Sequence, residues 1–193
     1  MVLAARDFVS PLDLVATTTA FFGGEIDLDP ASSTNANYVV QANRFFNWEQ
    51  NGLHQSWKAK NVYLFPPRDL LLKNEQPKSP VLFQKKLFFK KSAQRVWLEL
   101  CYHKWLRQEF EEAVVLITSS DVALIGTQKM GIDTPMCILR EHPKLMEDTP
   151  DLKPLKRTKV YGFVFYFPPT LNIERKVAEF SNQYSLLGRV YSQ

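Results

Sequence analysis

The chain has 193 residues, of which 45% are hydrophobic and 23% are charged, enough to form the core of one globular domain. It has no apolar run near the roughly 20 residues of a membrane-spanning helix, and its first residues lack the pattern of a signal peptide. Its two cysteines, Cys101 and Cys137, are too few for a disulfide framework and lack metal-ligand spacing. We therefore expect a single cytoplasmic domain over residues 1–193, with reduced, buried thiols and no metal.

Hydrophobic periodicity and turn residues predict helices that alternate with strands. In the first half of the chain, the pattern predicts a helix over 11–22, a strand over 25–28, a short helix over 33–43, a strand over 61–65 and a long helical stretch over 81–110. In the second half, it predicts a strand over 113–118, a short helix over 123–129, strands over 136–140 and 160–167, a helix over 173–184 and a last strand over 188–191. This alternation indicates the α/β class. We predict a mostly parallel central sheet with helices on both faces.

The net charge of +4 is concentrated in one window of the chain. Residues 68–95 contain eight basic and two acidic side chains, a local charge of +6. Most of this window, about 69–92, is interpreted as a basic insertion. Such a patch suits phosphate contacts, which supply most non-specific affinity for DNA or RNA. The candidate residues for binding nucleic acid or a protein partner are Lys73, Lys78, Lys85, Lys86, Lys90, Lys91 and Arg95. A solvated loop and helix face is an equally good interpretation.

Two short segments, residues 27–32 and 62–68, each combine a strand with a polar or proline-rich loop. Ligands of open α/β sheets bind at the carboxyl ends of strands, so the two loops are predicted to face one crevice. Together with Ser10-Pro11, Asn51-Gly52-Leu53 and Trp57, this pattern resembles the phage-type DNA N-6-adenine methyltransferases, the Dam-like family. The resemblance implies a Rossmann-like fold of the S-adenosylmethionine-dependent methyltransferase type.

The resemblance also implies a place for the cofactor. S-adenosylmethionine would lie beside the loop after the first strand, against Asp27, Asp29, Pro30 and Ala31. Asp29 would accept hydrogen bonds from the methionine part or the ribose. A structural interpretation stays open, because Asp-Pro is also an ordinary turn starter and Asp27 would suit a loop cap. The sequence therefore leaves two outcomes open: the protein still binds S-adenosylmethionine, or it has lost that binding.

The catalytic motif departs from the family at the residues that carry its chemistry. Family members hold the adenine amine with Asn or Asp followed by Pro-Pro, and stack an aromatic ring on the flipped base. Here the segment is Phe65-Pro66-Pro67-Arg68. Phe65 offers no useful hydrogen-bond acceptor, and a cation at Arg68 opposes the positive charge that develops on the amine. Because losing one oriented polar group commonly costs about 10²–10³ in rate, the motif predicts a degenerate catalytic site.

Three functions follow from these patterns. The first is a catalytically degenerate methyltransferase-like protein, a pseudoenzyme that binds nucleic acid or a protein partner. The second is an active S-adenosylmethionine-dependent methyltransferase that acts on DNA or on another acceptor bound by Arg68. The third is a structural subunit of a larger protein or ribonucleoprotein assembly.

Overall fold

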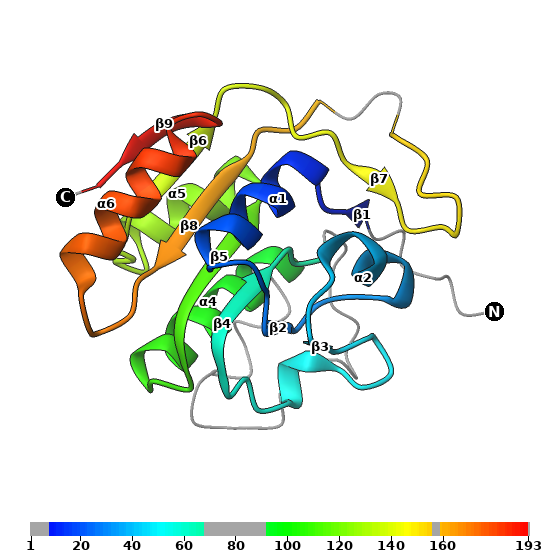
Figure 1. The fold of residues 1–193 in the computed structure, drawn as a ribbon, viewed down its shortest axis with the longest axis horizontal. Coiled ribbons are helices and arrows are strands. Elements are labelled where there is room, and N and C mark those ends of the chain that lie inside the picture. Colours follow the sequence, from blue (N-terminus) through cyan, green and yellow to red (C-terminus); the bar gives the residue numbers. More distant parts are fainter. Residues whose placement is uncertain (1–7, 68–91, 156–158, 193) are drawn as a thin grey trace.

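The computed structural model describes residues 8–67, 92–155 and 159–192. Within these residues the protein has an α/β architecture of three layers, with a central sheet between two groups of helices (Figure 1). No described helix has both the length and the hydrophobicity needed to cross a bilayer. The predicted insertion over about 69–92, apart from Ser92 at its end, lies outside the described residues, together with Arg68, Lys73, Lys78, Lys85, Lys86, Lys90 and Lys91.

The elements follow the predicted order along the chain. The helices are α1 (Leu12–Phe21), α2 (Thr34–Val40), α4 (Ala93–Leu106), α5 (Ser120–Gln128) and α6 (Ile173–Tyr184), with a 3-10 turn η1 (Gly52–His54). The strands are β1 (Phe8–Val9), β2 (Leu28–Asp29), β3 (Arg44–Phe45), β4 (Ala59–Leu64), β5 (Phe110–Ile117), β6 (Met136–Leu139), β7 (Met146–Glu147), β8 (Phe163–Phe167) and β9 (Gly188–Tyr191).

The main sheet of the described chain has the strand order β3-β2-β4-β5-β8-β6-β9. The strands from β3 to β5 are parallel, whereas β8, β6 and β9 each pair antiparallel with the preceding neighbour in this order. The prediction of a mostly parallel sheet is therefore correct for the first half only, and the sheet is mixed. The reason is that β8 is apolar on both faces, and such a run fits a central strand of either direction.

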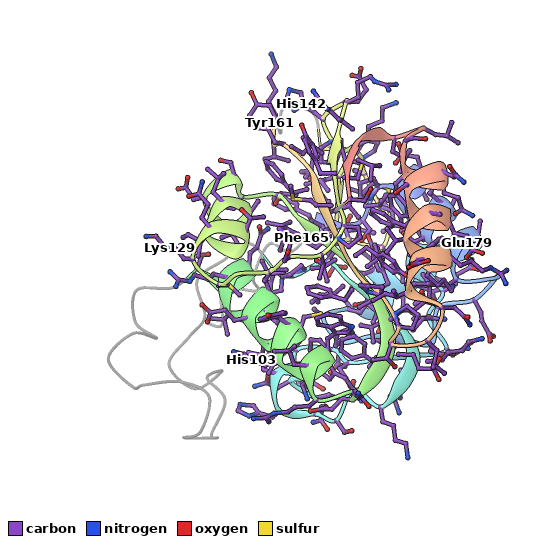
Figure 2. All side chains as sticks on the ribbon, turned by 90° about the vertical axis from the view of Figure 1, so that its left-hand side faces the viewer. His103, Lys129, His142, Tyr161, Phe165 and Glu179 are labelled. Carbon is purple, nitrogen blue, oxygen red and sulfur yellow. The ribbon has the colours of Figure 1, made fainter. Side chains whose placement is uncertain are left out.

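Helices cover both faces of the sheet, as predicted. Helices α4 and α5 pack on one face around a core that includes Trp57, Trp97 and Phe165. Helices α1 and α6 pack on the other face around a core that includes Tyr63 and Phe180. Figure 2 shows the two groups of helices on opposite sides of the sheet, with the Phe165 side chain between them.

The end of helix α4 differs from the prediction for a local reason. Helix α4 ends at Leu106 rather than near residue 110, because Gln108 adopts a left-handed φ of 57° and its N–H donates to the Trp105 carbonyl. Phe110 instead begins β5. Helix α1 begins at Leu12 without a side-chain cap.

Candidate functional site

The two motif loops leave the sheet at the same edge. Strands β2 and β4 are parallel neighbours, with Leu28 opposite Val62, and β5 continues the parallel set with Val115 opposite Leu64. The residues that follow these strands therefore lie along one carboxyl edge. This arrangement places the Asp29-Pro30-Ala31 loop next to the Phe65-Pro66-Pro67 loop.

Asp29 is the most perturbed carboxyl group at this edge. Its side chain is 3% exposed, and the Ala31 N–H donates to its Oδ1 at 3.1 Å. Burial raises the pKa of Asp29 to about 7, although the Ala31 amide and the nearby Ser32 hydroxyl partly lower it. A buried carboxyl that titrates near neutrality is a candidate functional group.

Tyr63 and Ser10 complete a buried group around Asp29. Tyr63 is fully buried and Ser10 is 3% exposed. Burial raises the pKa of Tyr63, the Ser10 hydroxyl lowers it, and the charges of Asp29 and Asp13 raise it further. We call Ser10, Asp29, Ser32 and Tyr63 the polar cluster. It presents a carboxyl, a phenol and two hydroxyls, which can exchange protons or hydrogen-bond a polar ligand.

Sequence reasoning did not assign Tyr63 a role. The available signal is a tyrosine between Val62 and Leu64 in a strand that is otherwise buried and apolar. A phenol placed there needs a polar partner inside the core. Among the described residues the Tyr63 hydroxyl has no hydrogen-bond partner. Ser10, which precedes α1, lies near enough to lower its pKa, and the strand alone does not reveal that neighbour.

Asp27 has a different environment from Asp29. It precedes β2, and its Oδ2 accepts hydrogen bonds from the N–H groups of Lys60 at 2.9 Å and Asn61 at 3.3 Å. The Asp27 N–H in turn donates to the Asn61 side-chain oxygen at 2.9 Å. These bonds hold β2 against β4, which supports the structural interpretation. The cofactor role of Asp27 stays a prediction.

The Asn51-Gly52-Leu53 segment and Trp57 support the loop that follows Asp29. A side chain at Gly52 would place its Cβ 1.9 Å from the Pro30 carbonyl oxygen, so the two backbones approach too closely for any other residue. The Trp57 Nε1–H donates to the Gly52 carbonyl at 2.8 Å, and the Trp57 ring stacks on Trp97 with centroids 5.9 Å apart. These family-like residues therefore have a packing role here.

Phe65 is the residue that the resemblance noted in the sequence sets against a polar amine acceptor, and this correspondence stays a prediction. Its side chain is 7% exposed and packs into the hydrophobic core beneath α1 and α6. Pro66 is buried and Pro67 is partly buried. The described part of the catalytic motif thus presents hydrocarbon toward the core at the end of β4.

A second polar group closes the end of β5. Gln94, near the start of α4, is 2% exposed. Its Nε2 donates to the Thr118 hydroxyl at 2.8 Å, and its Oε1 accepts from the N–H groups of Thr118 and Ser119, each at 3.1 Å. The Ser119 hydroxyl caps α5 by accepting from the Val122 N–H. These mutual hydrogen bonds favour a structural role for this end of the strand.

Of the candidate nucleic-acid residues, only Arg95 falls within the described part of the chain. Its Nε lies 3.0 Å from Oε1 of Glu99, one helical turn later, and its side chain is 27% exposed. Glu99 is nearly buried, so this ion pair anchors the guanidinium to α4. Arg95 is therefore less available to a phosphate than an unpaired surface arginine.

The remaining titratable residues give little indication of a metal centre. The described residues contain no group of three or more His, Cys, Asp or Glu side chains that could hold a metal ion. Cys101 and Cys137 are free and buried, as predicted. Burial raises the pKa of both thiols, that of Cys137 to about 12, which makes them poor nucleophiles.

Comparison of the chain with protein-family models, with curated proteins and with solved structures finds no match in any of the three.

Proposed function

We propose that this protein is a methyltransferase-like binding module that has lost adenine methylation and binds nucleic acid. The observation that carries the proposal is the burial of Phe65 in the hydrophobic core. In the family that the sequence resembles, this position presents a polar oxygen to the adenine amine. A phenyl ring turned into the core provides no such acceptor and leaves the position without room for one.

The energetic argument favours loss of activity over a weakened enzyme. A single oriented polar group at a reacting centre is commonly worth about 10²–10³ in rate. The chain has lost the acceptor at residue 65 and the aromatic ring at residue 68. The remaining Pro66 carbonyl can orient an amine but cannot replace both.

The nucleic-acid part of the proposal rests on charge. The window over residues 68–95 carries a local charge of +6 and begins directly after the Pro66-Pro67 loop. Its lysines can neutralise phosphates and release counterions, which gives salt-sensitive binding with little sequence preference. The rest of the chain has a net charge of −2, so this window holds the largest concentration of positive charge along the sequence.

Fluorescence anisotropy of a labelled oligonucleotide tests the proposal. Reversing the charge of Lys85, Lys86, Lys90 and Lys91 to glutamate should abolish binding at low salt. A matched control reverses four exposed lysines elsewhere and should retain most of the affinity (Lys58, Lys60, Lys129 and Lys144). Equal loss in both variants, or no loss in either, would contradict a specific role for the basic window.

A second candidate is an active methyltransferase with an altered acceptor, and the state of Asp29 favours it. A buried carboxyl with a pKa of about 7 at the carboxyl edge of parallel strands suits a ligand site. Calorimetric titration with S-adenosylmethionine and S-adenosylhomocysteine separates the two candidates. If the protein binds either compound with micromolar affinity and Asp29→Asn weakens that binding, the result would favour an active methyltransferase. Absence of binding would favour the scaffold.

A further inference from the structure

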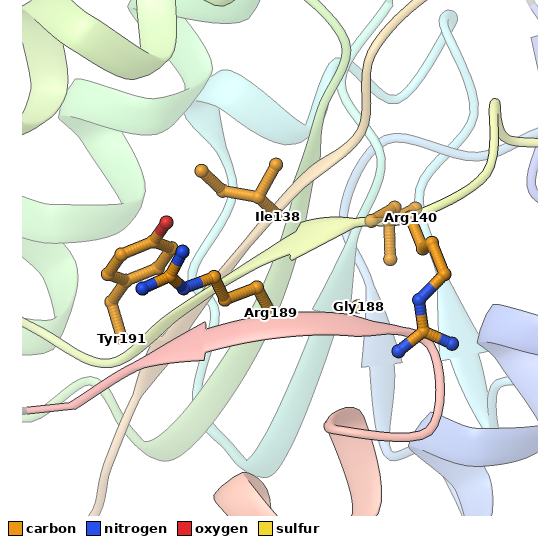
Figure 3. Close-up of a pocket in the computed structure, with 6 residues that line it drawn as sticks. Ile138, Arg140, Gly188, Arg189 and Tyr191 are labelled. Carbon is orange, nitrogen blue, oxygen red and sulfur yellow. The ribbon is translucent and has the colours of Figure 1, made fainter.

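An open hollow lies at the other end of the sheet, far in strand order from the polar cluster. It has a volume of about 420 Å³ and is lined by Ile138, Leu139, Arg140, Gly188, Arg189 and Tyr191 (Figure 3). These residues come from β6, the residue that follows it, and β9. Strand β9 is the last strand of the sheet in the described chain. The hollow therefore lies on an edge that is open to solvent.

The register of the two strands sets what faces the hollow. Ile138 lies opposite Arg189 and Leu139 opposite Gly188. A side chain at Gly188 would place its Cβ 2.1 Å from the Ile138 carbonyl oxygen, so only glycine allows β9 to lie this close to β6. The partly buried Ile138 side chain lies on the same face as Arg189, its opposite residue, and provides apolar surface there, whereas Leu139 packs against the core on the other face.

The walls of the hollow are cationic and aromatic. The Arg189 guanidinium lies 5.3 Å from the centroid of the Tyr191 ring, and Arg140 stands at the opposite end (Figure 3). Neither arginine forms an ion pair with another residue that the structure describes. The six lining residues include no acid. Tyr191 is 46% exposed, so much of its surface is free to contact a ligand.

We propose that this hollow binds single-stranded nucleic acid, with phosphates on Arg140 and Arg189 and one base stacked on Tyr191. The inference rests on the proposed nucleic-acid function and adds a second contact surface to it, outside the basic window. A guanidinium fork matches phosphate geometry, and aromatic rings beside cationic groups are the usual platform for unpaired bases. The volume is within the range of small-ligand sites.

A flexible single strand fits this surface better than the alternatives. The hollow is shallow and open along the edge of the sheet, so a chain can pass through it. The exposed Tyr191 ring, with the Arg189 guanidinium 5.3 Å from its centroid, offers a π surface on which a base can stack. An acidic peptide would interact with the two arginines but would not stack on Tyr191. In a duplex the faces of the bases are already stacked on one another, so they would be unavailable to Tyr191.

Binding of fluorescein-labelled oligo(dT) to the full chain tests the inference. We expect Arg140→Glu with Arg189→Glu to weaken binding at least tenfold. In a salt titration, replacing the two arginines by glutamine should reduce the slope of log affinity against log salt by roughly 1.4, at about 0.7 per phosphate. Tyr191→Leu should weaken binding about fivefold or more without changing that slope. Melting curves confirm that each variant is folded.

The control variant combines Arg107→Glu with Lys129→Glu. It changes the net charge by the same amount and alters two exposed side chains outside the hollow; its affinity should fall less than twofold. Loss of binding on reversal of the basic-window lysines, with no loss in the hollow variants, would overturn this inference and leave the proposed function intact. No oligonucleotide binding by the unmodified protein would overturn both. Binding of a polyglutamate peptide that competes with oligo(dT), together with indifference to Tyr191→Leu, would replace the nucleic acid by an acidic protein.

Discussion

The two ends of the sheet differ in how they use their polar residues. At the parallel end, the residues with a family-like pattern are buried: Asp29 and Tyr63 lie in a closed cluster and Phe65 packs into the core. At the antiparallel end, where the sequence shows no motif, Arg140, Arg189 and Tyr191 line an open surface. The residues that carry the sequence pattern therefore serve packing, whereas the surface suited to binding lies at the other end of the sheet. The following predictions test this contrast, beginning with the largest effect.

Substitution of Gly52 should give the largest loss of stability. In Gly52→Val the new Cβ would collide with the Pro30 carbonyl at 1.9 Å, and the backbone on both sides must move. We expect the free energy of unfolding to fall by about 4 kcal/mol, measured by urea denaturation. Gly126→Ala provides a contrast, because its Cβ would meet side-chain ends and no backbone atom, with the flexible end of Leu98 nearest at 3.1 Å; a change below about 1 kcal/mol is expected. Equal effects would show that Gly52 does not support the Pro30 loop.

Introducing the family's motif residues should lower the stability of the protein without restoring methyl transfer. Phe65→Asn removes a ring from the core and buries an amide, which we expect to destabilise the protein by about 3 kcal/mol. Phe65→Leu, which keeps an apolar side chain, should cost about 1 kcal/mol. The double variant Phe65→Asn with Arg68→Tyr should still transfer no methyl group to adenine. Methylation by that variant, detected by mass spectrometry, would show that the scaffold retained the rest of an active site.

Asp29 should make stability depend on pH. Its pKa is about 7 in the folded protein and near 3.8 when unfolded, so the folded state binds more protons between these values. The free energy of unfolding should therefore fall as the pH rises from about 4 to about 7, by about 4 kcal/mol, and level off above. Asp29→Asn should flatten this profile and be more stable than the unmodified protein at pH 8. An unchanged profile in the variant would assign the titration to another group.

Arg95 should show the smallest effect. Its ion pair with Glu99 is partly exposed, so Arg95→Gln should lower the free energy of unfolding by about 1 kcal/mol or less. Because the guanidinium is already paired, oligonucleotide affinity should change less than it does for Arg189→Gln. If Arg95→Gln instead weakened oligonucleotide binding more than Arg189→Gln, the main nucleic-acid contact would lie at the parallel end of the sheet, which would contradict the contrast drawn above.

The fold was predictable where local pattern decides the structure. Helix α6 and strand β9 have the predicted bounds, because α6 places its apolar side chains on one face and Gly188 marks the start of the strand. Strand β5 matches its continuous apolar run apart from its first residues. The direction of β8 was not predictable, since strand direction depends on long-range pairing and an apolar strand fits either way.

The candidate site was less predictable than the fold. The rule that ligands of open α/β sheets bind at the carboxyl ends of strands placed the Asp29 and Phe65 loops at one crevice, although the strand order itself was not predicted. The role of Gln94 depends on Thr118, and the environment of Tyr63 depends on Ser10 and Asp29 nearby; these neighbours come from distant elements, which no local spacing indicates. The hollow lined by Arg140 and Tyr191 arises from the antiparallel pairing of β6 and β9, the part of the topology that the sequence pattern left open.

The most direct measurement is mass spectrometry of an adenine-containing single-stranded oligonucleotide recovered from the protein after incubation with S-adenosylmethionine. The account predicts that the oligonucleotide is retained by the protein and recovered with unchanged mass. Recovery of a methylated oligonucleotide would contradict the loss of catalysis, and failure to retain it would contradict the binding function.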